Sequence, residues 1–133
     1  MNGGPALVSI LRQGHTLVAS VHTALDDSQM VRFQEDLVRQ IGQHRARGVI
    51  IDVAALDVID SFAARTLRAT SEMARLRGAA LVIVGIQPDV ATAMVRLGMG
   101  MGTVPTALDL EEGLAYLAEL QRSPWAPPGT RSP

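Results

Sequence analysis

Two runs of almost entirely aliphatic residues, most of them β-branched, constrain the fold more than any other feature of the chain. They are residues 49–53 (VIIDV), with the acidic Asp52 near the C-terminal end, and residues 81–84 (LVIV). Runs of this length and composition are typical of strands that are buried on both faces of a sheet. An interval of about thirty residues suits a right-handed β-α-β crossover, which places the two strands parallel. The centre of the chain therefore predicts an α/β fold.

The segment between these two runs has the periodicity of a helix. A polar stripe follows one side of residues 61–77, formed by Arg65, Arg68, Glu72 and Arg75. Gly78 comes next, and glycine is common directly after a helix because it adopts a left-handed backbone without strain. We therefore predict a helix over residues 61–77, ended by Gly78.

Two strands and a helix are predicted before the first apolar run. Residues 7–11 and 16–21 are rich in apolar and β-branched residues, and the turn residues between them favour a hairpin. Residues 25–28 (LDDS) then form a cap signal for the start of a helix. Apolar residues follow at helical spacing, at Met30, Phe33, Leu37 and Ile41. We expect this amphipathic helix to end near Gly48.

After the second apolar run, the pattern predicts a helix, a short strand and a last helix. Pro88 suits the first turn of a helix over residues 88–97, with Leu97 facing inward. Residues 103–104 predict an edge strand that Pro105 stops. The last helix, residues 109–121, is expected to pack through its leucines, Leu110, Leu114, Leu117 and Leu120.

The predicted element order is β-β-α-β-α-β-α-β-α. We therefore expect an α/β domain with a mixed sheet of about four to five strands and about four helices. Residues 6–121 are expected to form this single domain, and residues 1–5 a flexible N-terminus without the features of a signal peptide. Four of the seven prolines follow Gln121. Because proline interrupts helices and central strands, residues 122–133, which include Trp125, predict a disordered tail.

Composition excludes several chemistries. The chain has no cysteine, and all 12 of its basic residues are arginine. Without cysteine there is no disulfide, thiolate nucleophile or cysteine-ligated metal, and without lysine there is no Schiff base or Walker A loop. A formal net charge of −1 gives no basic face for nucleic acid, and no apolar run reaches the length of a membrane helix. We expect a cytoplasmic protein without a cofactor, not bound to nucleic acid or membrane.

The polar segment with most functional interest is residues 56–62 (LDVIDSF), between a buried strand and a helix. In α/β sheets, functional groups are commonly exposed at the edge formed by the carboxyl ends of the strands. Ser61 is expected to cap the helix, and capping alone would explain a serine there. The alternative is that Ser61 is a phosphoacceptor, because a helix N-terminus tolerates added negative charge. A phosphate beside Asp57 and Asp60 would make one acidic patch that repels an acidic or apolar partner surface.

Enzymatic and metal-binding interpretations have less support. Ser61 lacks a Gly-x-Ser-x-Gly context, and the spacing of His15, His22 and His44 predicts no contact with it. No cluster of histidines and carboxylates has the spacing of metal ligands. Asp52 at a strand end invites comparison with response-regulator receivers, but the acidic pair after the first strand and the late lysine are both missing. We therefore predict no catalytic residue and no metal site.

Three segments taken together resemble a known family. Residues 57–62 (DVIDSF), 84–91 (VGIQPDVA) and 107–114 (ALDLEEGL) are similar to the RsbS-like STAS-domain proteins, which belong to the anti-sigma-factor antagonists. Residues 33–37 (FQEDL) agree as well. The resemblance extends over residues 7–121. Either of the first two motifs alone would be weak, but their combination is specific.

The resemblance implies a non-catalytic scaffold and phospho-switch in the general stress response. RsbS-like proteins assemble with RsbR-type sensor paralogues into the stressosome, which holds an RsbT-type serine kinase. That kinase phosphorylates the serine of the Ile-Asp-Ser motif, here Ser61, and is then released. An RsbX-type phosphatase removes the phosphate again. Asp57, Asp60, Phe62 and Ala63 would then contribute to partner binding, with core packing as the alternative for Phe62.

Serine at position 61, where RsbR-type sensors usually have threonine, favours the RsbS type. The resemblance leaves one alternative function open. Some STAS domains are anti-sigma-factor antagonists or binding modules that do not assemble into a stressosome, and the sequence is compatible with that role.

Overall fold

A computed structural model describes residues 6–98, 100–102 and 104–122. Within them the chain forms strands and helices in the predicted order. The strands are β1 (Val8–Gln13), β2 (Thr16–Val21), β3 (Gly48–Asp52), β4 (Ala80–Val84) and β5 (Thr106–Ala107). The helices are α1 (Asp27–His44), α2 (Ser61–Leu76), α3 (Pro88–Arg96) and α4 (Leu110–Arg122). The predicted α/β class and mixed sheet are confirmed.

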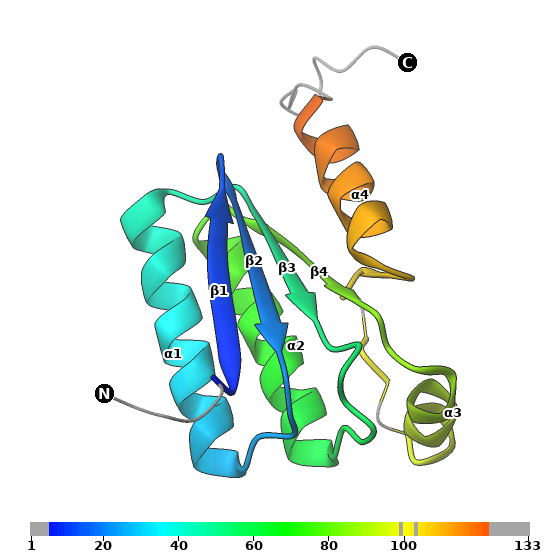
Figure 1. Ribbon diagram of the computed structural model, residues 1–133. Coiled ribbons are helices and arrows are strands. Elements are labelled where there is room, and N and C mark those ends of the chain that lie inside the picture. The colour runs from blue at the N-terminus through cyan, green and yellow to red at the C-terminus, as the bar shows by residue number, and fades with distance from the viewer. Residues whose placement is uncertain (1–5, 99, 103, 123–133) are drawn as a thin grey trace.

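The strands form one sheet in the order β1-β2-β3-β4-β5. β1 and β2 are an antiparallel hairpin, and every other neighbouring pair is parallel. Figure 1 shows α1 and α2 side by side on one face of the sheet and α4 on the other. Helix α3 lies near the end of the sheet where the parallel strands finish (Figure 1). The carboxyl ends of β2, β3 and β4 therefore share one edge with the starts of α1, α2 and α3.

The main core lies between the sheet and helices α1 and α2. Alternate residues of β2 (Leu17, Ala19 and Val21) face it. β3 and β4 are apolar on both faces, and Ile50 packs with Leu117 of α4 on the opposite side. This double burial explains why the two central runs are continuously apolar, whereas β2 alternates.

The FQEDL segment of the family resemblance joins α1 to α2. Phe33 and Leu37 are buried in the main core. Between them, the Gln34 side-chain amide donates a hydrogen bond to the hydroxyl of Thr70, with 3.1 Å between Nε2 and Oγ1. The Thr70 hydroxyl is fully buried and donates in turn to the carbonyl oxygen of Thr66. A buried hydroxyl paired in this way avoids a desolvation penalty, so Gln34 fixes how the two helices pack.

Three sequence predictions for residues 97–107 are wrong in detail. The edge strand is Thr106–Ala107, after Pro105, and not residues 103–104. Pro105 starts the pairing rather than stopping it, because its carbonyl oxygen accepts a hydrogen bond from the backbone N–H of Ile83. Leu97 is 71% exposed, since α3 ends at Arg96 and the inward stripe does not continue.

The contact face of α4 is narrower than its leucines predict. Gly113 and Leu117 are the buried residues of this helix, whereas Leu110 and Leu120 are 38% and 45% exposed. A Cβ atom on Gly113 would come within 2.7 Å of Val84, so the missing side chain allows the helix to cross close to the sheet there. Helix α4 also extends to Arg122, one residue into the predicted tail. The rest of that tail, with Trp125, and residues 1–5 lie outside the described residues.

Candidate functional site

The segment between β3 and α2 lies at the carboxyl edge of the parallel strands and carries the predicted site. Two of its side chains, Leu56 and Ile59, are buried and anchor it to the main core. Between them, Asp57 and Val58 are exposed. Buried anchors on both sides give a short loop a defined position, so its polar residues are presented in a fixed arrangement.

Asp60, and not Ser61, caps helix α2. Asp60 has an extended backbone, and its carboxylate accepts a hydrogen bond from the backbone N–H of Ala63 at 2.8 Å. The prediction that Ser61 is the cap is therefore wrong, because the preceding aspartate already takes that position and aspartate caps as well as serine does. Ser61 is the first residue of α2 and is exposed, and no side-chain hydrogen bond within the described residues involves it.

Phe62 and Ala63 are half-buried and pack against the main core. The carbonyl oxygen of Phe62 accepts a hydrogen bond from the hydroxyl of Thr66, at 2.8 Å, within the first turns of α2. Both side chains therefore hold the start of the helix on the sheet. Phe62 therefore packs against the core with part of its surface and remains partly exposed, so both interpretations of this residue stay open.

The 84–91 motif contacts the chain that leads from β3 to the 57–62 motif. Gln87 lies in the loop between β4 and α3, and its side-chain amide donates to the carbonyl oxygen of Ala54 at 2.8 Å. Gly85 has φ +84°, and a Cβ atom there would come within 2.9 Å of the Ala54 side chain. The Gly-Ile-Gln-Pro motif therefore holds the loop that leads to Ser61. The sequence contained both segments, but their separation of about thirty residues concealed this contact.

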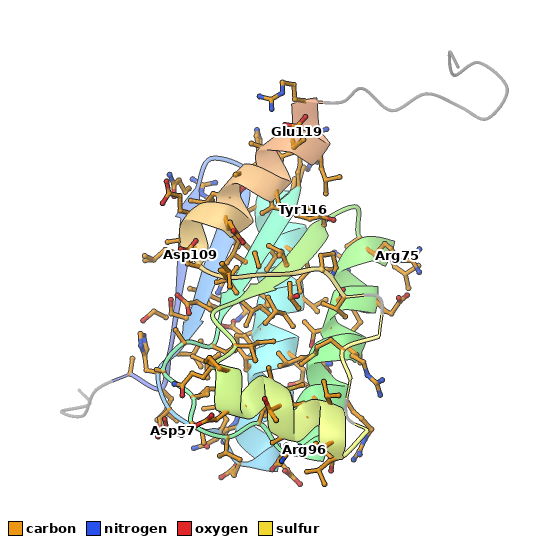
Figure 2. The ribbon with its side chains drawn as sticks, turned by 90° about the vertical axis from the view of Figure 1, so that its right-hand side faces the viewer. Asp57, Arg75, Arg96, Asp109, Tyr116 and Glu119 are labelled. Atoms are coloured by element: carbon orange, nitrogen blue, oxygen red, sulfur yellow. The ribbon has the colours of Figure 1, made fainter. Side chains whose placement is uncertain are left out.

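Helix α3 forms the other side of this site. Its contribution was not predicted from the sequence. A pocket of about 360 Å³ lies between residues 57–61 on one side and Asp89, Val90, Ala93 and Leu97 on the other. Figure 2 shows Asp57 near the N-terminal end of α3, with Arg96 at the opposite end. The signal that could have indicated this surface is the spacing of four between Asp89, Ala93 and Leu97, which places them on one side of the helix.

The polar rim of this pocket is acidic. Asp57, Asp60 and Asp89 line it, and none of the lining residues within the described chain is basic. No group of three or more histidine, aspartate or glutamate side chains in the described residues could hold a metal ion. The histidines lie elsewhere: the ring of His22 is hydrogen-bonded to the Ser9 hydroxyl, and that of His44 to Arg12. The geometry therefore presents a hydroxyl on an acidic, partly apolar surface.

A second capped helix start, that of α1, lies at the same end of the sheet (Figure 1). Asp26 caps it, accepting from the backbone N–H of Gln29 at 2.8 Å and from the hydroxyl of Ser28 at 3.0 Å. The Gln29 side chain accepts from the Asp26 N–H and closes a capping box. The hydrogen bond from Gln29 N–H, followed by that from Ser28, lowers the pKa of Asp26 below its ordinary value.

Known proteins are similar to this chain in sequence and fold. Residues 8–113 match the STAS domain model. A serine-to-glutamate variant of RsbS from Moorella thermoacetica is 35% identical, with a TM-score of 0.77 over 89% of this chain and 100% of that chain. A chain in a solved structure of the stressosome, described as a signal integration and transduction hub, is 32% identical, with a TM-score of 0.69 over 86% and 100% of the two chains.

Among curated proteins, the RsbT co-antagonist protein RsbRA of Bacillus subtilis (strain 168) is 31% identical over 96 residues. The match covers 72% of this chain but 35% of RsbRA, so the chain spans only about a third of that relative's length. No helix in the described part of the chain has the length and apolar character needed to span a bilayer. The family model and the structural matches, which cover nearly all of the described residues, show that the chain belongs to the STAS-domain family, among its RsbS-like proteins.

Proposed function

We propose that this chain is a non-catalytic scaffold and phospho-switch of a cytoplasmic stressosome, with Ser61 as its phosphoacceptor. The observation that carries the proposal is the position of Ser61, exposed at the first residue of α2 while Asp60 does the capping. Its hydroxyl is therefore accessible and is not needed to close the helix. The reaction transfers the γ-phosphoryl group of ATP to the Ser61 oxygen, which loses its proton, and leaves ADP.

The physical setting of Ser61 supports a switch that leaves the fold intact. A phosphate adds about −1.5 to −2 charge, and the dipole at a helix N-terminus tolerates it. The same charge falls on a surface that already carries Asp57 and Asp60. Phosphorylation therefore changes the surface strongly and the core little, as a switch at a protein interface requires.

The proposed partners follow from the relatives. RsbRA is described as an RsbT co-antagonist, which supports an RsbT-type serine kinase as the bound partner of the unphosphorylated chain. Similarity to a stressosome chain supports assembly with RsbR-type paralogues through their STAS domains. An RsbX-type phosphatase would remove the phosphate and restore kinase binding. Asp57, Asp60, Phe62 and Ala63, around Ser61, are the proposed partner-binding residues.

Intact-mass analysis tests the switch directly. The chain is incubated with an RsbT-type kinase and Mg-ATP, and we expect one added phosphoryl group on the wild type and none on Ser61→Ala. Ser61→Asp should weaken binding of the kinase, whereas Ser61→Ala should bind it permanently. An unmodified wild-type chain in the presence of an active kinase would overturn the proposal.

Size-exclusion chromatography with an RsbR-type paralogue tests assembly. A stressosome scaffold should elute with the paralogue in a particle far larger than a dimer. Elution of the two proteins separately, or as a small complex, would favour the alternative function, a STAS antagonist or binding module that acts outside a stressosome. Phosphorylation of Ser61 would still be expected in an antagonist of an anti-sigma kinase, so the two experiments report on separate parts of the proposal.

A further inference from the structure

The pocket beside Ser61 has apolar walls that face solvent. Val58 on the loop is 60% exposed, and Leu97 at the end of α3 is 71% exposed. Both border the same hollow, whose deeper residues Ile59 and Val90 are buried. Single exposed leucines are common on protein surfaces, but apolar side chains on both sides of one hollow mark a surface suited to binding.

Charge identifies the chemistry of the occupant. Asp57, Asp60 and Asp89 surround the apolar walls, and none of the pocket-lining residues within the described chain is basic. An apolar side chain flanked by basic residues complements such a surface, because it fills the hollow and pairs the carboxylates of the rim. An acidic partner would meet like charges instead.

We infer that this pocket receives an apolar side chain, flanked by basic residues, from the kinase that acts on Ser61. Helix α3, through Asp89, Ala93 and Leu97, is then a second part of the docking surface, in addition to the loop and the start of α2. The inference rests on the proposed function and extends it to α3, including Ala93 and Leu97, which lie outside the family motifs.

The shared pocket also explains how phosphorylation releases the partner. Ser61 lines the same hollow as Val58 and Leu97. A phosphate on Ser61 must stay hydrated, and an apolar side chain seated over it would remove that water without replacing its hydrogen bonds. Added attraction to basic residues at an exposed rim is weak and screened by salt. Loss of hydration therefore outweighs the added attraction, and the phosphorylated surface releases the partner.

The test compares two exposed aliphatic residues at the C-terminal end of α3, Val95 inside the helix and Leu97 at its C-cap. Val95 is 76% exposed but does not line the pocket, so Val95→Ser is the matched control for Leu97→Ser. Binding of the RsbT-type kinase to each unphosphorylated variant is measured by isothermal titration calorimetry. We expect Leu97→Ser to raise the Kd about tenfold, which corresponds to about 1.4 kcal/mol, and Val95→Ser to change it less than about twofold.

Asp89→Asn tests the charge of the rim. We expect a Kd about threefold higher at low ionic strength, with a smaller difference at high salt, because exposed charges are screened. Leu97 and Asp89 are both exposed, so both variants should keep the fold, which circular dichroism checks.

The outcomes separate this inference from the function on which it rests. If Leu97→Ser binds the kinase as tightly as the wild type, and the wild type is phosphorylated, the pocket is not a docking site and the proposed function stands. If Leu97→Ser instead changes only the oligomeric state, the occupant is a second STAS domain and the inference is wrong. A wild-type chain that neither binds the kinase nor gains a phosphate overturns both.

Discussion

The N-termini of α1 and α2 are capped in the same way, but the serine in the first turn of each helix has different hydrogen bonding. Both lie at the carboxyl edge of the sheet, and each is capped by an aspartate that accepts from a backbone N–H at 2.8 Å. Each has an exposed serine in its first turn, Ser28 in α1 and Ser61 in α2. The Ser28 hydroxyl is bound to Asp26, whereas no side-chain hydrogen bond in the described residues holds Ser61.

The two helix starts differ in whether their polar side chains satisfy one another. At α1 the aspartate, the serine and Gln29 satisfy one another in a closed set of hydrogen bonds. At α2 the residue in the place of Gln29 is Ala63, which has no side-chain acceptor, so the capping box is absent. Ser61 instead lines a pocket formed with another helix. The polar groups of α1 stabilise α1, whereas the Ser61 hydroxyl at α2 is exposed and makes no side-chain hydrogen bond within the described residues.

The largest expected contrast between the two starts is in phosphorylation. With an RsbT-type kinase and Mg-ATP, Ser28→Ala should be modified as fast as the wild type, and Ser61→Ala not at all. A kinase that recognised only a serine beside aspartates at a helix start would modify both sites. Peptide mapping of the phosphorylated chain by mass spectrometry locates the mark, and a phosphate on Ser28 would show that the pocket beside Ser61 does not determine the choice.

The next largest effect concerns the contact between the β4–α3 and β3–α2 loops. Gly85→Ala places a Cβ atom against Ala54 in a backbone with positive φ, and we expect a loss of about 3 kcal/mol in the free energy of unfolding. Gly78→Ala is the control, because its φ is +85° with nothing within 4 Å of the new atom. It carries only the backbone strain, about 1–2 kcal/mol. Equal losses in urea unfolding would show that the loop contact is unimportant.

The sequence predicted the layers of this fold because periodicity and turn residues are local signals. The apolar runs of β3 and β4 and the cap signal before α1 each act within a few residues, and each is found as predicted. Element ends were less accurate where a distant contact decides them. The β5 strand follows Pro105 because its carbonyl oxygen pairs with Ile83, and nothing in the local sequence indicates that partner.

The site was predicted in part, for the same reason. Residues 57–63 are contiguous, so the motif located the loop and the exposed Ser61 together. The choice between two adjacent capping residues, Asp60 and Ser61, depends on where the backbone turns into the helix, and both types cap well. Leu97 lines the pocket because α3 ends one residue earlier than predicted and faces the β3–α2 loop, and neither feature could be predicted from the local sequence.

Removing either helix cap is expected to lower the stability less than Gly85→Ala does. Asp60→Ala should lower the free energy of unfolding by about 1 kcal/mol, the usual value for one lost cap. Asp26→Ala should have the larger effect, because it removes the cap, the partner of Ser28 and one half of the capping box. Urea unfolding of both variants shows which one loses more stability. A larger loss for Asp60→Ala would mean that the α2 start depends on its cap more than its hydrogen bonds indicate.

The smallest expected effect is a pH dependence located at α1. The backbone N–H of Gln29, and then the Ser28 hydroxyl, donate to the Asp26 carboxylate and lower its pKa below its ordinary value. A carboxyl group whose pKa is lower in the folded state stabilises the fold above its unfolded pKa, near pH 4, and loses that contribution as the pH falls through the folded value.

Asp26→Asn removes this titration and keeps a side chain that can still cap. We therefore expect the difference in stability between the wild type and Asp26→Asn to be constant above about pH 5 and to shrink as the pH falls below about 4. Thermal unfolding of both proteins, measured at several pH values across this range, gives the difference in stability. A difference that does not change with pH would show that the hydrogen bonds of Asp26 do not favour its charged form, and the closed arrangement at α1 would then stabilise the helix through its geometry rather than through the charge of its cap.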